Sequence, residues 1–295
     1  ALSSEDTDGK NTAIGAYALN ALNAGEDAYN VAVGYVAGYV MSTGTSNVLL
    51  GSQAGDALTT GSHNVAIGRG ALGGEDAHGR NVAIGHEALN SQNAGADAYN
   101  VAIGYKAGTA VSTGVRNTIM GGYAGQALTT GSYNVAVGYG ALMQEDGNGK
   151  NTALGMQALN ALNAGADAFD VAVGYQAGFA MTTGTHNVFV GGLAGDAYTT
   201  GGQSVGIGYE ALSTEDDHGG STAIGYRALK MQNSGAANKN VAVGYDAGTA
   251  VTTGVESVFI GGHAGDAVTT ASANVAIGYS ALSTEDTMGN NVAVG

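Results

Sequence analysis

Asn64-Val65-Ala66-Ile67-Gly68 is one copy of the five-residue motif that decides the fold of this chain. The motif occurs seventeen times, from Asn11 to Asn291, with Asn, Asp or Ser first and Gly last in every copy. The first copies begin at positions 11, 30, 47, 64 and 81, so one longer step is followed by three equal shorter ones. This set of four steps then repeats along the chain. We call the segment from one motif to the next a coil. Self-similarity at a short, fixed period predicts a repeat architecture rather than independent globular domains.

Each coil contains a strand pattern, a corner and a turn-rich return. Val or Thr follows the first motif residue, and Ile, Val, Leu or Met comes two positions later, which is the period of a strand. The motif Gly predicts a corner with positive φ or without room for a Cβ atom. Three residues later, Ala occurs in all sixteen complete coils, from Ala18 to Ala281, which predicts an inward site in a narrow core. Gly, Thr, Ser, Asp and Asn in the rest of the coil supply turns.

A single coil is too short to bury its own apolar face, but stacked coils can, with each strand pairing to the next. The sequence therefore predicts an all-β fold, a parallel β-solenoid of about 17 coils of 17–19 residues. We expect residues 1–10 to be part of a preceding coil and residues 11–295 to form a single continuous solenoid. Its 70-residue units, here super-repeats one to four, cover residues 11–80, 81–150, 151–220 and 221–290.

The composition is not that of an ordinary globular domain. Gly contributes 52 of 295 residues, Pro, Cys and Trp are absent, and only 11% of residues are charged, against roughly 25% in typical domains. The net charge of −15 makes nucleic acid a poor partner. No run of about 18 apolar residues occurs, so we expect no membrane insertion. Because the chain starts at Ala1 and stops within a motif at Gly295, we expect a piece of a longer protein.

One strand position predicts a surface for a partner. The middle residue of the motif is usually Ala, but it is large and apolar in the third coil of every super-repeat. The four large residues are Leu49, Ile119, Phe189 and Phe259. If their neighbours point inward, these side chains form an apolar outward stripe, which predicts a protomer interface and a homo-oligomer, with a trimer favoured over a filament. The alternative is that the coil inverts this face and the four side chains fill the core.

Two further columns follow from the repeat. Tyr follows the motif Gly in the second coil of each super-repeat, at Tyr35, Tyr105, Tyr175 and Tyr245. An exposed Tyr column can stack on the sugar rings of a cell-surface glycan, although we favour rings that cover a strand edge or pack between protomers. The first motif position predicts a structural ladder of stacked side-chain amides. Its first six members are Asn11, Asn30, Asn47, Asn64, Asn81 and Asn100.

Acidic pairs recur with the period of the super-repeats, at Glu5/Asp6, Glu75/Asp76, Glu145/Asp146, Glu215/Asp216 and Glu285/Asp286. Successive pairs are roughly 19 Å apart by strand spacing, too far to share one Ca²⁺. A single pair with neighbouring carbonyls can bind Ca²⁺ weakly, although solvated turns are the favoured interpretation. The six His residues form no His-x-x-x-His pair and no stacked column, so no zinc site is expected.

Short matches to catalytic motifs occur, but the surrounding sequence does not support a catalytic role for them. Residues 202–206 spell the Gly-x-Ser-x-Gly of a hydrolase elbow, but Ser204 takes the Asn position of its coil and no strand-to-helix turn follows. The acidic residues are dispersed, whereas a polysaccharide-cleaving β-helix needs clustered carboxylates. We therefore expect no enzyme, no catalytic residue and no cofactor.

The repeat motifs resemble those of two families of fibrous proteins. Residues 64–68, followed by Ala71-Leu72, resemble the head repeats of YadA-type trimeric autotransporter adhesins. Thr129-Thr130-Gly131-Ser132, followed by residues 134–138, resembles the shaft repeats of phage tail fibres equally well. The resemblance implies a left-handed parallel β-roll, usually trimeric, on a virion fibre or a bacterial cell surface. The coils are longer here than in the adhesin heads.

We therefore expect a non-enzymatic structural or adhesive fibre, the β-solenoid shaft of an extracellular appendage. Its coils provide length and stiffness, and its outward side chains contact protomers and, weakly, host-surface glycans. Three alternatives remain, namely a self-assembling filament subunit, an ice-binding solenoid with Thr arrays, and a polysaccharide-cleaving β-helix.

Overall fold

The computed structural model describes residues 1–4, 9–215, 217–235, 237–284 and 287–295. The regular secondary structure in these ranges consists of strands, which confirms the all-β class. Within the same ranges, no helical segment has the length and apolar character needed to cross a membrane. The chain divides into two compact units, Ala1–Gly149 (unit one) and Lys150–Gly295 (unit two). The single continuous solenoid over residues 11–295 stays a prediction.

Unit one contains strands β1 to β8, each of three residues and each on a motif. They are β1 (Thr12–Ile14), β2 (Val31–Val33), β3 (Val48–Leu50), β4 (Val65–Ile67), β5 (Val82–Ile84), β6 (Val101–Ile103), β7 (Thr118–Met120) and β8 (Val135–Val137). Each strand pairs in parallel with the next one along the chain, motif position against motif position. Ala66 of β4, for example, lies opposite Ala83 of β5. This is a parallel β-solenoid with one turn for each motif, as expected.

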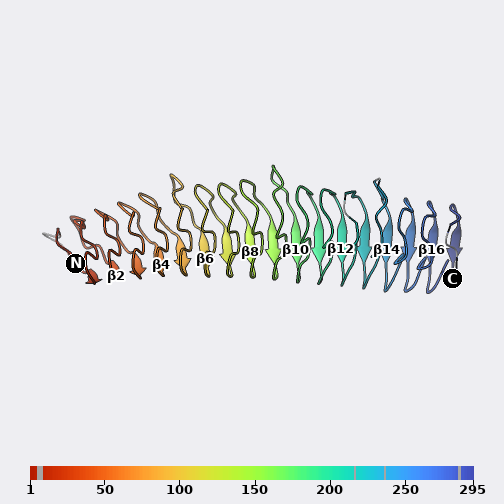
Figure 1. Cartoon of the computed structure of the whole chain (residues 1–295), viewed down its shortest axis with the longest axis horizontal. Coiled ribbons are helices and arrows are strands. Elements are labelled where there is room, and N and C mark those ends of the chain that lie inside the picture. The colour runs from red at the N-terminus through yellow and green to blue at the C-terminus, as the bar shows by residue number, and fades with distance from the viewer. Residues whose placement is uncertain (5–8, 216, 236, 285–286) are drawn as a thin grey trace. The chain divides into compact units, whose positions relative to one another are not determined.

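Unit two repeats this arrangement. Its strands are β9 (Thr152–Leu154), β10 (Val171–Val173), β11 (Val188–Val190), β12 (Val205–Ile207), β13 (Thr222–Ile224), β14 (Val241–Val243), β15 (Val258–Ile260), β16 (Val275–Ile277) and β17 (Val292–Val294). Consecutive strands again pair in parallel and without a shift of register. Within each unit, Figure 1 shows the strand arrows side by side, each joined to the next by one loop.

The corner after each strand needs Gly for two reasons. Gly68 has φ +132°, a conformation that L side chains rarely adopt. A Cβ atom at Gly68 would also lie 2.4 Å from the carbonyl oxygen of Gly85, the matching Gly of the next coil. Backbone approach of this kind recurs from coil to coil, as at Gly34 against Gly51. The motif Gly therefore sets both the direction of the chain and the close stacking of its coils.

The core is narrow and largely made of Ala. All sixteen Ala residues at the predicted inward position are buried, from Ala18 to Ala281. The middle residue of the strand also points inward, and it is buried in every strand from β2 to β16. Because two columns of inward residues are mostly Ala, the opposite walls of a coil lie close together. Each coil therefore has room for few large side chains in its core.

The predicted outward stripe is therefore corrected. Leu49, Ile119, Phe189 and Phe259 are completely buried, so they are core residues and not protomer contacts. The reason is size compensation. A Cβ atom on Gly55 would lie 2.8 Å from Leu49, and one on Gly195 would lie 2.5 Å from the Phe189 ring. The large middle residue thus fills the space that Gly leaves one position after the inward Ala.

The motif Asn column binds neighbouring coils together. The main-chain N–H of Asn47 donates to the side-chain oxygen of Asn30, and that of Asn64 donates to Asn47, both at 2.9 Å. Across its own coil, the Asn47 amide donates to the carbonyl of Gly61 at 2.9 Å. The side-chain oxygens of all six predicted ladder residues accept from the next coil in this way: Asn11, Asn30, Asn47, Asn64, Asn81 and Asn100. In the bonds between coils, a main-chain N–H donates to a side-chain oxygen, and bonds between two side-chain amides, such as Asn47 to Asn30, are the exception.

Candidate functional site

The outward side of the strands forms an uncharged apolar surface in each unit. The first residue of every strand is Val or Thr, and the third is Ile, Val, Leu or Met. We call the surface made by these two columns the sheet face. Its side chains are half-buried or exposed; Met120 is 38% exposed and Ile224 is 37% exposed. The first and third residues of each strand point outward. An apolar stripe therefore exists, but on residues other than those predicted.

Aromatic side chains follow the corner on one border of the sheet face. Tyr35, Tyr105, Tyr175 and Tyr245 are 46–57% exposed, so the predicted Tyr column lies at the surface. In unit two, Tyr245 stacks on Tyr226 with a centroid distance of 5.0 Å and an interplanar angle of 10°. In unit one, Tyr105 stacks on His86 at 5.3 Å. These rings form short exposed ladders that match the spacing of about 4.8 Å between strands.

A second set of aromatic residues stands just before the motif, on the other border of the sheet face. Arg80 lies over the ring of Tyr99, 5.5 Å from its centroid, and also pairs with Asp97. Lys10 makes the same set of contacts with Tyr29 and Asp27, and hydrogen bonds to both raise the pKa of Lys10. These ion pairs lie beside the sheet face, whose two columns hold no charged residue.

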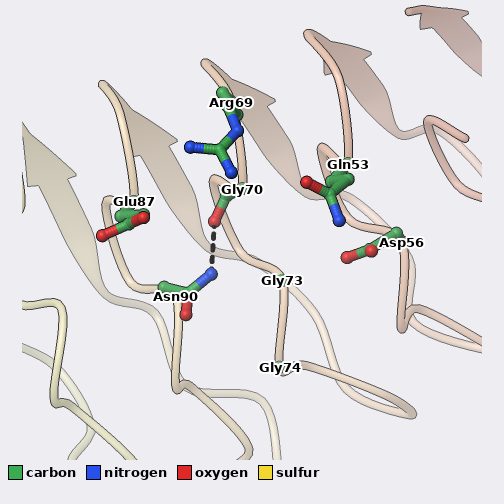
Figure 2. A pocket seen from close by; sticks show the side chains of 8 residues that line it. All are labelled: Gln53, Asp56, Arg69, Gly70, Gly73, Gly74, Glu87 and Asn90. Carbon is green, nitrogen blue, oxygen red and sulfur yellow. Dashed lines mark hydrogen bonds between the residues drawn. The ribbon is translucent and has the colours of Figure 1, made fainter. Parts of the chain in front are cut away.

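A polar pocket of about 320 Å³ opens in unit one beside the coil that begins at Asn64. Figure 2 shows its lining, which consists of Gln53, Asp56, Arg69, Gly70, Gly73, Gly74, Glu87 and Asn90. The side chains come from three successive coils, and the Asn90 amide donates to the Gly70 carbonyl at 2.8 Å. The pocket depends on the glycines, because a Cβ on Gly73 would lie 2.8 Å from the Asn90 amide nitrogen.

The same places in super-repeat three carry side chains. Glu210 stands where Gly70 stands in super-repeat one, and it pairs with Lys230 at 2.5 Å. Ser213 and Thr214 take the places of Gly73 and Gly74. Gly70, Gly73 and Gly74 in one coil are therefore the sequence signal for the pocket, which was not among the predicted sites.

Both hydrogen-bond donors and acceptors surround the pocket. Burial raises the pKa of the Asp56 carboxyl above its usual range. Glu87 lies 3.5 Å from the Lys106 ammonium, and Arg69 lies 3.2 Å from the ring nitrogen Nε2 of His86. A mixture of carboxylate, amide and guanidinium groups around an open hollow suits a neutral ligand with many hydroxyl groups.

The hydroxyls of the Thr arrays donate to the backbone of the next coil, although Thr60 and Thr130 are exposed. The Thr59 hydroxyl donates to the carbonyl of Asp76 at 2.6 Å, and Thr129 does the same to Asp146. Thr60 donates to the carbonyl of Ala77 at 3.3 Å. Hydroxyls that already donate hydrogen bonds to the next coil do not favour an ice-binding surface.

The acidic turns differ from the solvated turns that we expected. Glu75, Glu145 and Glu215 are completely buried, whereas Asp76 and Asp146 are exposed. The other members of these pairs, Glu5, Asp6, Asp216, Glu285 and Asp286, lie outside the described residues. Among the described residues, Glu75, Asp76 and His78 form one cluster whose ligand atoms all lie within 4.8 Å of one another. The spacing Glu-Asp-x-His was the signal, and it was missed because the His residues were considered separately from the acidic pairs.

Comparison with known proteins adds no functional assignment. No protein-family model matches this chain, and no curated protein matches its sequence. What the repeat and the structure establish together is the fold, a parallel β-solenoid in each unit.

Proposed function

We propose that the protein is a non-enzymatic structural fibre, the shaft of an extracellular appendage, and that it works as a homotrimer joined through its sheet faces. The observation that carries this proposal is the sheet face itself. Its two columns hold no charged residue in a chain of net charge −15. Extended apolar surfaces on a soluble protein mark sites of association.

A second copy of the chain suits this surface for a geometric reason. The eight strands of unit one, at about 4.8 Å spacing, make its sheet face roughly 34 Å long. Another copy presents side chains at the same spacing, so ridges on one face match grooves on the other along the whole length. Elsewhere, the 24 acidic residues keep unrelated surfaces apart. The resemblance of the motifs to phage tail fibres and YadA-type adhesins supports the same proposal and suggests a virion fibre or a bacterial surface as its place.

Light scattering after size-exclusion chromatography tests the assembly. We expect a molar mass of three times the 28.9 kDa chain. Ile67→Lys and Ile84→Lys place a charge in the sheet face and should reduce the mass to one chain. Asn93→Lys adds the same charge on an exposed loop and should leave the trimer intact. A wild-type monomer would contradict the proposal, and very large species would indicate a filament instead.

An assay for reducing ends tests the non-enzymatic part. Incubation with bacterial polysaccharides should release no sugar above the level of a buffer control. Saccharide release that follows the protein through purification would establish a polysaccharide-cleaving solenoid and overturn the proposal.

The pocket of Figure 2 favours a second candidate function, a weak contact with surface glycans. Saturation-transfer NMR with methyl glycosides of glucose, galactose and mannose tests it. Gly70→Ser, Gly73→Ser and Gly74→Thr together introduce the residues found at these places in super-repeat four, and they should abolish transfer. Tyr35→Ala and Tyr245→Ala should leave it unchanged. Loss with the Tyr variants alone would move the glycan site to the Tyr column, and no transfer in the wild type would exclude both.

A further inference from the structure

The turn at Glu75, Asp76 and His78 is the strongest unexplained polar feature of unit one. Glu75 is completely buried, and its oxygen Oε2 has no hydrogen-bond partner. The ring nitrogen Nδ1 of His78 is also buried and has no hydrogen-bond partner. Nδ1 lies 3.8 Å from Oε1 of Glu75. Two adjacent buried atoms of this kind are costly unless a third group satisfies both.

The turn is held in place by its neighbours. The carbonyl of Asp76 accepts from the main-chain N–H of Thr59 at 2.5 Å and from its hydroxyl at 2.6 Å. The carbonyl of His78 accepts from the Asn64 amide at 3.3 Å. Within the turn, the N–H of His78 donates to Oε1 of Glu75 at 3.0 Å. The backbone that carries the three candidate ligands is therefore held by the preceding coil and by the motif Asn of its own coil, which lowers the cost of ordering the ligands on binding.

Super-repeat three provides an internal comparison. Oε2 of Glu215, the counterpart of Glu75, accepts from Gln232 at 3.1 Å and from the amide of Asn238. In the coil next to Glu75, the residue at the place of Asn238 is Ala98, whose side chain has no donor. The place of Gln232 is taken by Gln92, whose amide donates to the carbonyl of Ser112 instead. The buried carboxylate is thus satisfied by protein donors in one super-repeat and left open in the other.

We propose that Glu75, Asp76 and His78 bind a divalent transition-metal ion of the Zn²⁺ type. Imidazole with carboxylate oxygens is a typical donor set for such ions, whereas Ca²⁺ takes six to eight oxygen ligands. Two ligands of a tetrahedral zinc ion, each at about 2.0–2.1 Å, lie roughly 3.4 Å apart. The 3.8 Å between Nδ1 and Oε1 and the 4.8 Å limit for the whole set are close to this spacing. The exposed Asp76 carboxylate supplies the third ligand from the solvent side and leaves a position for water.

Calorimetric titration of the metal-free protein with Zn²⁺ tests the site. We expect one strong site per chain, which a tenfold excess of Ca²⁺ does not occupy. Glu75→Gln keeps the side-chain shape, and His78→Asn introduces the residue that super-repeat two has at this place, Asn148. Each should weaken Zn²⁺ binding more than about tenfold, since loss of even an outer partner of a metal ligand costs that much. Circular dichroism establishes that both variants are folded.

His218→Asn is the matched control, because it changes the corner in which Glu215 already has two amide donors. It should leave the strong site unchanged. Zn²⁺ should also raise the melting temperature of the wild type and of His218→Asn but not of His78→Asn, as linkage requires. Absence of a strong site in the wild type, full affinity in His78→Asn, equal weakening by His218→Asn, or displacement by Ca²⁺ would each overturn the proposal.

Discussion

The phenol of Tyr198 donates a hydrogen bond of 2.5 Å to the main-chain oxygen of His218. In super-repeat one, the equivalent oxygen of His78 accepts from the amide of Asn64. The motif residue in super-repeat three is Ser204, which is too short to reach across the coil, and its hydroxyl lies 2.6 Å from the Tyr198 phenol. Tyr in place of Leu58 thus compensates for Ser in place of Asn64, and the same carbonyl is satisfied by another side chain.

Loss of this phenol should destabilise unit two. Tyr198→Phe leaves the part-buried His218 carbonyl without this donor, so we expect a loss of about 1–3 kcal/mol in the free energy of unfolding. The double change Tyr198→Leu with Ser204→Asn restores the pairing of super-repeat one and should recover most of that loss. Urea unfolding followed by circular dichroism measures both. A double variant no more stable than Ser204→Asn or Tyr198→Leu alone would contradict the compensation.

Leu49 and Leu50 lie on opposite sides of strand β3, with Leu49 in the core and Leu50 on the sheet face. Leu49→Ala empties a buried site and should cost about 2–5 kcal/mol in unfolding free energy. Leu50→Ala removes a half-buried side chain from the sheet face, and we expect a change within about 0.5 kcal/mol. Unfolding is compared at concentrations where light scattering shows a single chain. Equal costs at the two positions would contradict the inward orientation of the middle residue.

The corner glycines should not tolerate a side chain. Gly68→Ala brings a Cβ atom to 2.4 Å from the Gly85 carbonyl at φ +132°, so we expect a loss of at least about 1–3 kcal/mol. Gly95→Ala is the control. Gly95 also has positive φ, +70°, but no atom lies within 4 Å of its ideal Cβ position. Thermal unfolding of both variants checks the difference, and a Gly68→Ala protein as stable as Gly95→Ala would show that coils can move apart without cost.

Buried carboxyls should make the protein less stable as the pH rises. Burial raises the pKa of Glu75 above its ordinary value of 4.5, so the folded state holds this proton more tightly than the unfolded state. The contribution is fully present below pH 4.5 and is lost as the pH rises through the folded pKa. In the presence of a chelator, Glu75→Gln should therefore gain stability relative to the wild type between pH 4 and pH 7. Urea titrations at both pH values measure the difference, and a constant difference would contradict a raised pKa.

Several features followed from residue pattern alone because they are local. The motif spacing placed all the described strands, and the invariant Ala correctly indicated a narrow core. The motif Gly indicated a corner, which the positive φ at Gly68 confirms. These inferences needed only the two-residue period of a strand and the steric limits of a backbone without room for Cβ.

Which side of each strand faces the core could be determined only from the packed coils. Alternation shows that Leu49 faces away from Val48 and Leu50, but it is symmetrical and does not say which side is the inside. The choice depends on volume, because Leu49 fits only where Gly38 and Gly55 leave space, and both glycines lie outside the motif, Gly38 in the preceding coil. Likewise, the open Oε2 of Glu75 depends on which donors the next coil brings near it. The sequence by itself determined the repeat, the strands and the corners, while the tertiary structure decided which faces are buried and which polar groups lack partners, since both depend on contacts between coils.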